Sequence, residues 1–208
     1  MQVLIIGAGG HGQVVADILL QMRNAGSRLM PLGYLDDDPA LTGQVRLGLR
    51  VLGTTADLSM IGHDALILGI GSNSVRQRLF QQLGDLAEHF VSLKHPSAVV
   101  ASGVKIGPGS VICAGVVINP ASKVGANVIL NTACTVDHHN HIGDHCHIGP
   151  GAHLGGEVSI GEGALVGIGA IVMPQRRVGN RTIVGAGALV HDDLPDGVVA
   201  VGVPAKVI

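Results

Sequence analysis

The chain has 208 residues, a net charge of −2 and a hydrophobic fraction of 47%, whereas aromatic residues make up only 1%. This length allows one or two domains, and the lack of a basic stripe argues against nucleic acid as a partner. No apolar run reaches the roughly 18 residues that a membrane helix needs, so we expect no membrane insertion.

The first predicted element is a strand, Val3–Ile6, which runs into the glycine-rich segment Gly7–Gly12. No basic leader precedes it, so the start is interpreted as a strand and not as a signal peptide. An amphipathic helix is expected over Gln13–Met22, and the glycines before it let backbone N–H groups approach a phosphate at the helix N-terminus. Glycines that only allow a tight strand–helix turn remain an alternative, because such motif matches are common.

Further strands are predicted at Pro31–Leu35 and Ala65–Ile70, and a second helix at Ser74–Leu83. Asp36 and Asp37 directly follow the second strand, where their side chains can bind a ribose or a base. Strands that alternate with helices predict a small Rossmann-like parallel α/β domain. This domain, residues 1–93, is only half of a dinucleotide fold, so a nucleotide-linked substrate is preferred to NAD.

A six-residue repeat occupies the second predicted domain, residues 94–208, which follows a hinge at Lys94–Pro96. A period of six indicates short strands joined by tight turns, with three strands in each coil of about 18 residues and coils stacked about 4.8 Å apart. This predicts a parallel β-helix from about Val100 to Val190. The position four residues after each aliphatic is mostly small, so it is expected to point inward as well. Every sixth residue is aliphatic: Ile106, Ile112, Ile118, Val124, Leu130, Val136, Ile142, Ile148, Leu154, Ile160, Val166, Val172, Val178, Val184 and Val190.

Six of the eleven histidines lie between His138 and His153. His141, His147 and His153 share one position of the repeat, so they lie on three successive faces, and no metal site is expected within one subunit. A general base is the better use of one histidine, because imidazole with a pKa of about 6.5 accepts protons at neutral pH. Gly156 follows His138 by one coil, which stacks its backbone N–H beside His138 as an oxyanion donor.

The whole chain resembles the hexapeptide-repeat sugar acetyltransferases of the sialic acid O-acetyltransferase type, most closely the UDP-4-amino-sugar N-acetyltransferases of bacillosamine biosynthesis. The motifs that carry the resemblance are GAGGHG, the DDD segment, Asn131–Thr132, Val136–His138, His147 and the terminal Gly202–Lys206. The resemblance implies that the β-helix is left-handed, that acetyl-CoA is the co-substrate and that the protein is a homotrimer.

The resemblance also implies residue roles. His138 is the catalytic base, Gly156 supplies the oxyanion N–H, and Asn131 lies near the acceptor group. The coenzyme A residues are His147, Gly156, Ile168, Ala186, Pro204 and Lys206. The residues of the sugar-nucleotide pocket are Gly9, His11, Asp36, Asp37, Gly71, Asn73 and Arg76.

One position departs from the family pattern. The family commonly has an acid directly after the base, which polarises it, whereas this chain has His139. Either Asp137 or Asp144 replaces that acid, or the base is weaker. The sequence therefore leaves open which residue orients His138.

The spacing of the histidines bears on assembly. His138 and His147 are half a coil apart, so they face different sides of one β-helix and can meet only if His147 comes from a neighbouring subunit. This favours active sites between the protomers of a cyclic trimer. The odd set of three cysteines, without a CxxC pair, is expected to be reduced, which fits the cytoplasm.

The sequence thus predicts acetyl transfer from acetyl-CoA to the amino group of a nucleotide-activated sugar. Two alternatives stay open at this point. One is O-acetylation of sialic acid or another glycan sugar by the same residues. The other is a non-catalytic scaffold or a metal protein of the γ-carbonic anhydrase type. The sequence does not identify the sugar, the nucleotide or the pathway.

Overall fold

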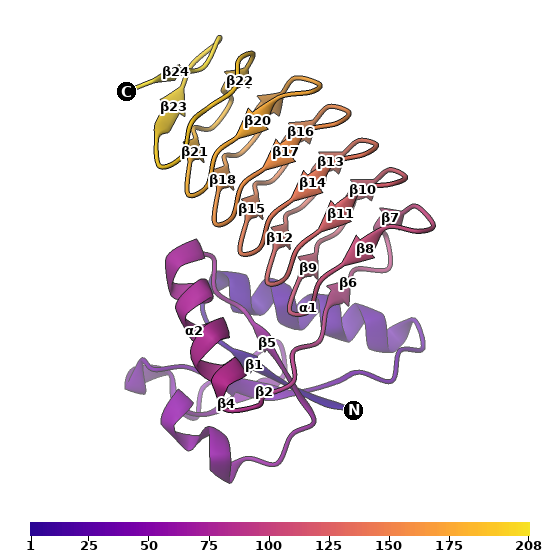
Figure 1. Ribbon diagram of the computed structural model, residues 1–208. Coiled ribbons are helices and arrows are strands. Elements are labelled where there is room, and N and C mark those ends of the chain that lie inside the picture. The colour runs from indigo at the N-terminus through magenta and orange to yellow at the C-terminus, as the bar shows by residue number, and fades with distance from the viewer. The chain divides into compact units, whose positions relative to one another are not determined.

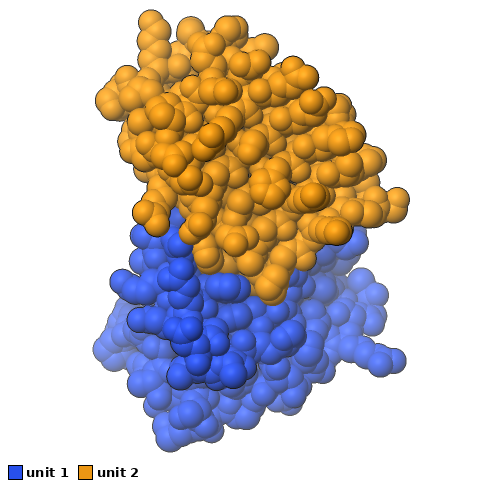
Figure 2. Space-filling model, in the orientation of Figure 1, with its two compact units in different colours: residues 1–96 blue, residues 97–208 orange.

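A computed structural model describes all residues, 1–208, and their contacts divide the chain into two compact units, Met1–Pro96 and Ser97–Ile208. Figure 2 colours the two units separately. The division falls at the end of the segment Lys94–Pro96 that the sequence indicates as a hinge, slightly after the expected boundary at residue 93.

The first unit contains a mainly parallel sheet with the strand order β3-β4-β2-β1-β5 (Figure 1). Strands β4, β2, β1 and β5 run parallel, and only β3 is antiparallel to its neighbour β4. The predicted strands are β1, β2 and β5, whereas β3 and β4 were not predicted. The strands are β1 (Gln2–Ile6), β2 (Met30–Leu35), β3 (Val45–Arg46), β4 (Leu49–Gly53) and β5 (Ala65–Leu68).

Two α-helices accompany this sheet, α1 (Gly10–Asn24) and α2 (Asn73–Asp85), and both are longer than predicted. Helix α1 begins at Gly10 with Gly9 as its N-cap, and no side chain caps it. Neither helix is long and apolar enough to cross a membrane. The unit also contains the 3₁₀ helices η1 (Pro39–Leu41) and η2 (Thr55–Met60) and the short strand β6 (Leu93–Lys94).

The alternation of side chains along β1 divides the core of this unit between two faces of the sheet. Leu4 and Ile6 belong to an apolar cluster that includes Leu83 of α2. Val3 and Ile5 are also fully buried but point to the opposite face. With both faces covered, a strand is apolar along its whole length, as β1 is.

The second unit is a left-handed parallel β-helix in which two-residue strands form three sheets (Figure 1). Strands one coil apart pair in register, for example Val117 with Thr135 and Ile129 with His147, which confirms the 18-residue coil. We name the sheets I, II and III in the order in which the chain visits them.

Sheet I contains β7 (Val99–Val100), β10 (Val117–Ile118), β13 (Thr135–Val136), β16 (His153–Leu154), β19 (Ile171–Val172) and β22 (Leu189–Val190). Sheet II contains β8 (Lys105–Ile106), β11 (Lys123–Val124), β14 (His141–Ile142), β17 (Ser159–Ile160) and β20 (Arg177–Val178). Within this unit, sheet III contains β9 (Val111–Ile112), β12 (Ile129–Leu130), β15 (His147–Ile148), β18 (Leu165–Val166), β21 (Ile183–Val184), β23 (Val199–Val201) and β24 (Lys206–Val207).

The interior of the β-helix has the composition that the repeat predicts. From Ile112 onward the repeated aliphatic residues are at most 4% exposed, and the small residues between Ser110 and Ala188 that follow them are also buried. Inward hydroxyls bond to the backbone of the next coil; Ser122 Oγ donates to the Asp137 carbonyl (2.7 Å) and accepts from the Asn140 N–H (3.1 Å). These buried hydroxyls thus replace their hydrogen bonds to water with hydrogen bonds to the backbone.

The corners of the β-helix each use one residue in the left-handed backbone conformation. This residue recurs every six positions and includes non-glycine residues such as Asn127 (φ 55°), His139 (φ 59°) and His145 (φ 62°). Asparagine and histidine tolerate this region better than most residues. The chain ends in an antiparallel β23–β24 hairpin, which is joined to the last coil by a hydrogen bond from the Ala205 N–H to the Leu189 carbonyl (2.7 Å).

Candidate active site

His138 lies at the corner between sheets I and II, after β13, and its side chain is exposed. Gly156 occupies the same corner one coil later, and the two positions are in contact. A Cβ atom added to Gly156 would lie 2.6 Å from His138 Cε1 and 2.7 Å from Nε2. The imidazole therefore lies against the backbone of Gly156, with its Cε1–Nε2 edge nearest to the Cβ position. The predicted stacking of His138 and Gly156 is confirmed.

The backbone N–H of Gly156 donates no hydrogen bond within the chain, although its neighbours Gly155 and Glu157 both donate to carbonyls. The same corner position holds Pro120 one coil before His138 and Pro174 one coil after Gly156, and proline has no N–H. The fold therefore does not need an N–H at this position. At Gly156 a donor is left free beside the His138 imidazole, as an oxyanion site requires.

The acids near His138 in the sequence do not contact its ring. Asp137 accepts hydrogen bonds from the backbone N–H of His138 (2.8 Å) and from Asn119 Nδ2 (2.8 Å). The Asn119 bond, followed by that from the His138 N–H, holds the pKa of Asp137 below its usual value. Asp144 lies at the corner between sheets II and III, where it accepts from the Ala126 N–H (2.7 Å). Only His139 approaches the imidazole, with the two Nδ1 atoms 3.1 Å apart.

Asn131 and His147 form a second group, at the corner between sheets III and I. Asn131 Oδ1 accepts from the Thr132 N–H (2.8 Å), which directs the amide nitrogen toward His147 Nε2 (3.0 Å). An amide nitrogen only donates, so His147 Nε2 accepts, and a neutral His147 carries its proton on Nδ1.

Ile168 and Ala186 follow at this same corner in later coils. The N–H of Gly187 donates to the Ile168 carbonyl (2.8 Å), which fixes the stacking of the two turns. The Ile168 side chain is 63% exposed and faces solvent. Pro204 and Lys206 belong to the terminal hairpin and are exposed.

The predicted acetyl-transfer residues thus fall at two different corners of one β-helix. His138 and Gly156 share the corner between sheets I and II, whereas Asn131, Ile168 and Ala186 share the corner between sheets III and I. The other clustered histidines are dispersed as expected, because His141, His147 and His153 belong to sheets II, III and I.

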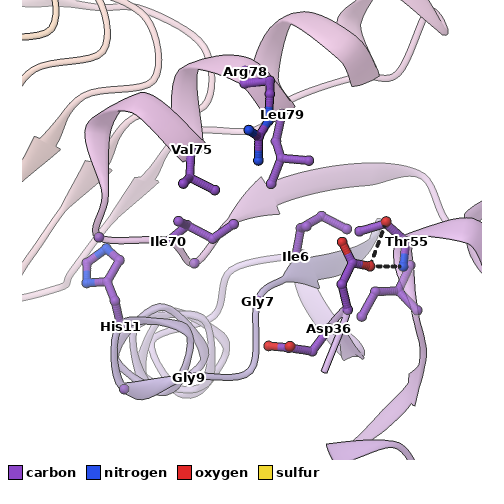
Figure 3. A pocket seen from close by; sticks show the side chains of 15 residues that line it. Ile6, Gly7, Gly9, His11, Asp36, Thr55, Ile70, Val75, Arg78 and Leu79 are labelled. Carbon is purple, nitrogen blue, oxygen red and sulfur yellow. Dashed lines mark hydrogen bonds between the residues drawn. The ribbon is translucent and has the colours of Figure 1, made fainter. Parts of the chain in front are cut away.

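A cavity of about 400 Å³ opens in the first unit at the carboxyl ends of β1, β2 and β5 (Figure 3). A cavity of this size and position is typical of ligand sites in parallel sheets. It is lined by Ile6, Gly7, Gly9, Gly10, His11, Leu35, Asp36, Asp37, Thr55, Gly69, Ile70, Gly71, Val75, Arg78 and Leu79.

Two aspartates shape this cavity by hydrogen bonding to backbone. Asp36 accepts from the N–H of Ala8 (2.7 Å) and from the N–H of Asp38 (3.0 Å). Asp37 Oδ1 accepts from the N–H (2.8 Å) and the hydroxyl (2.7 Å) of Thr55. Figure 3 shows Asp36 and Thr55 on one side of the cavity and His11 with Val75 on the other.

Glycine is required where α1 leaves the sheet. A Cβ atom on Gly12 would overlap the carbonyl oxygen of Gly7, so any larger residue would push the helix away from the end of β1. His11 follows the helix start, and burial, aided by the nearby Arg76 charge, lowers its pKa to about 4. At neutral pH His11 is therefore an uncharged wall of the cavity.

Five of the predicted pocket residues line the cavity: Gly9, His11, Asp36, Asp37 and Gly71. Asn73 and Arg76 do not. The Arg76 side chain is 1% exposed and donates to the carbonyls of Ile70 (3.2 Å) and Gly71 (3.3 Å) and to Asn73 Oδ1 (3.0 Å). It holds the loop that borders the cavity, whereas Arg78 supplies the cationic lining.

Comparison with known sequences agrees with this two-part layout. Residues 2–83 match the PglD N-terminal domain family. The chain is 40% identical over 109 residues to a UDP-N-acetylbacillosamine N-acetyltransferase of Bacillus subtilis, an alignment that covers 51% of this chain and 49% of that protein. The chain thus spans about half the length of this curated relative.

Comparison with solved structures extends over the whole chain. A perosamine N-acetyltransferase variant of Caulobacter crescentus, with histidine replaced by asparagine and in complex with CoA and GDP-perosamine, superposes with a TM-score of 0.91. It is 41% identical, and the match covers 100% of this chain and 97% of that one. The acetyltransferase domain of PglB from Neisseria gonorrhoeae, in complex with acetyl coenzyme A, gives a TM-score of 0.92 at 37% identity and covers 100% and 98%. The chain therefore belongs to the hexapeptide-repeat sugar N-acetyltransferases that begin with a PglD-type domain.

Proposed function

We propose that this protein transfers the acetyl group of acetyl-CoA to an amino group of a nucleotide-activated sugar. The observation that carries the proposal is the His138 imidazole resting on Gly156, beside a backbone N–H that has no partner in the chain. This arrangement pairs a general base with an oxyanion donor, the two groups that acyl transfer needs. A relative named as a perosamine N-acetyltransferase matches both halves of the chain.

The proposed reaction needs no covalent enzyme intermediate. The neutral amine of the sugar attacks the thioester carbonyl, a C–N bond forms, and the Gly156 N–H donates to the oxygen that becomes negative. His138 Nε2 takes a proton from the attacking nitrogen. The C–S bond then breaks, and the proton passes to the leaving thiolate, so the products are an amide and coenzyme A.

The cavity of the first unit is the proposed site of the nucleotide part of the sugar substrate. The N-terminus of α1 has no side-chain cap, and its backbone N–H groups and the positive end of the helix dipole favour a diphosphate. Arg78 adds a positive charge to the lining. Asp37 Oδ2 has no hydrogen bond in the chain and is free to accept from a ribose or a base.

Acetyl-CoA is proposed to bind along the corner between sheets III and I. The exposed Ile168 and Ala186 offer an apolar track there for the pantetheine arm. Asn131 and His147 lie in earlier coils of the same corner and would meet the acetyl end. Pro204 and the exposed Lys206 lie in the terminal hairpin, at the end proposed for the nucleotide of coenzyme A.

A cyclic trimer would join the two corners into one site, and the outer faces of the β-helix support it. Sheet II presents polar residues outward (Lys105, Lys123, His141, Ser159 and Arg177). Sheets I and III present mostly apolar ones, including Ile171 (45% exposed) and Ile183 (41%), with Thr135, His153 and His147 among the polar exceptions. Two apolar faces provide the two contacts that each protomer makes in a ring of three. Each site would then combine His138 of one protomer with the His147 position of its neighbour.

Mixing of inactive subunits tests this assembly. We expect His138→Ala and His147→Ala homotrimers to be impaired, and their co-expression to restore about a quarter of the wild-type sites, because each site draws its two subunits independently (1/2 × 1/2). The matched control mixes His138→Ala with Gly156→Ala, which lie at the same corner of one chain, so no wild-type site can form. Equal recovery in the two mixtures, or recovery in neither, would contradict shared sites.

A substrate panel tests the activity itself. We expect coenzyme A release with UDP- or GDP-linked 4-amino sugars, and little with the same sugars carrying a hydroxyl at that carbon, because a hydroxyl is far less nucleophilic than a neutral amine. Thiol release gives the rate, and mass spectrometry identifies the amide. Turnover of only the hydroxyl sugars would show O-acetylation instead, and no release with any sugar would refute the proposal.

The cytoplasm is the proposed location, since acetyl-CoA and nucleotide sugars are made there. Cys113, Cys134 and Cys146 are buried and form no disulfide, as is usual in a reducing compartment.

A further inference from the structure

His138 lacks a carboxylate partner, and His139 occupies the place where one would act. The two Nδ1 atoms are 3.1 Å apart, and the rings meet edge to face with an interplanar angle of 82°. A hydrogen bond between two imidazole nitrogens needs one donor and one acceptor, so only one of the two Nδ1 atoms carries the proton.

The position of Gly156 decides which nitrogen of His138 does the chemistry. The point that a Cβ of Gly156 would occupy is 2.7 Å from His138 Nε2 and 3.2 Å from Nδ1. Nε2 is thus the ring nitrogen nearer to this point beside Gly156, where the reacting carbonyl is proposed to bind, and it must be unprotonated to act as a base. A neutral His138 then carries its proton on Nδ1, which faces His139.

We propose that His139 is a positioning residue whose Nδ1 accepts the hydrogen bond from His138 Nδ1–H and so keeps Nε2 unprotonated and directed at the substrate. The inference rests on the proposed function of His138 as the base. In this pair His139 holds its own proton on Nε2. When His138 takes the proton of the amine, its Nδ1–H becomes a stronger donor, so the same bond stabilises the imidazolium.

No nearby carboxylate contacts the His138 ring, so His139 is the acceptor beside it. The Asp137 carboxylate is held by the His138 backbone and by Asn119. Glu157 lies one coil above His139 at the same corner, but its carboxylate bonds to Gln175 Nε2 (3.4 Å) and forms no ion pair with either imidazole. His139 has the left-handed backbone conformation (φ 59°) that this corner position requires, and its ring contacts that of His138.

Three variants at position 139 separate an acceptor role from a general structural one. Asparagine favours the left-handed conformation, and its Oδ1 can accept from His138 Nδ1–H but cannot titrate. We expect His139→Asn to retain activity within a few-fold, and His139→Ala to lower kcat about 10- to 100-fold with KM nearly unchanged. His139→Asp adds a negative charge and should raise the midpoint of the acid limb of the kcat profile. The control, His141→Asn, changes an exposed histidine of sheet II and should alter none of these values.

Nitrogen-15 NMR of the imidazoles tests the pair without any turnover. We expect His138 to carry its proton on Nδ1 in the wild type and in His139→Asn, and to shift to the Nε2–H form in His139→Ala. If His138 is protonated on Nε2 in the wild-type protein, or if His139→Ala changes neither the tautomer nor kcat, the inference is wrong. Since the tautomer is read in the unliganded protein, this outcome is independent of whether amino sugars prove to be the substrates.

Discussion

We expect His138→Ala to lower kcat by about 100- to 10,000-fold, the range that loss of a general base produces, with little change in the KM for acetyl-CoA. The alanine removes the side-chain group nearest to Gly156, the one proposed to take a proton from the amine. The fold does not depend on the ring, because the backbone N–H and carbonyl of His138, which bond to Asp137 and to the Glu157 N–H, are retained.

The rate is measured as thiol release at saturating concentrations of both substrates, together with the melting temperature. His141→Ala is the matched control, because His141 is exposed three residues further on and lies on sheet II. A His138→Ala protein with wild-type turnover would exclude His138 as the base.

We expect Gly156→Ala to lower kcat by about 100- to 1,000-fold, a loss comparable to removing one oxyanion donor. The new methyl would lie 2.6 Å from His138 Cε1, closer than a carbon–carbon contact allows, so the imidazole must rotate away from the Gly156 N–H. Only a side chain is displaced, and Gly156 is not in the left-handed region, so we expect the melting temperature to change little.

Gly84→Ala is the control for the substitution itself. Gly84 lies in α2, no atom would contact its Cβ, and its backbone is not left-handed, so activity should be unchanged. The double variant His138→Ala with Gly156→Ala separates the two causes. If the methyl acts mainly by displacing the imidazole, Gly156→Ala costs far less in the His138→Ala background than in the wild type. If Gly156→Ala lowers kcat by the same factor in both backgrounds, the substitution acts on the Gly156 N–H alone and not through the imidazole.

The β-helix was predictable because its pattern is strict. The six-residue repeat predicts which positions point inward, both the aliphatic and the small ones, and that residues 18 apart stack. Because His138 and Gly156 are 18 residues apart, their contact could be predicted from the sequence. The same counting placed His138 and His147 on different sides. It could not show that Asn131 bonds to His147, because that contact depends on how the amide is oriented by Thr132.

The first unit was less predictable, since its elements are short and its pairings are not local. Strands β3 and β4 escaped prediction because neither is a continuous apolar run like β1 or β5: each contains an arginine and exposed positions. Helix α1 was expected too late because Gly10–Gly12 favours turns over helices. Arg76 and Arg78 could not be told apart, since two residues in a helix differ by about 200° in direction, and only the packing shows which one faces the cavity.

The regular spacing of the stacked coils also determines the distance between residues along the β-helix. Along sheet III, β15 with His147 is separated from β23, at the start of the terminal hairpin, by β18 and β21. Three steps of about 4.8 Å span about 14 Å. In the proposed binding mode, the nucleotide of coenzyme A is held at Lys206 and the acyl end at His147. The number of coils between these residues thus sets the length of the pantetheine arm that can span them. Insertions or deletions of one whole coil would change that length by one step of the stack, whereas a length that is not a multiple of six would put the inward residues after it out of phase.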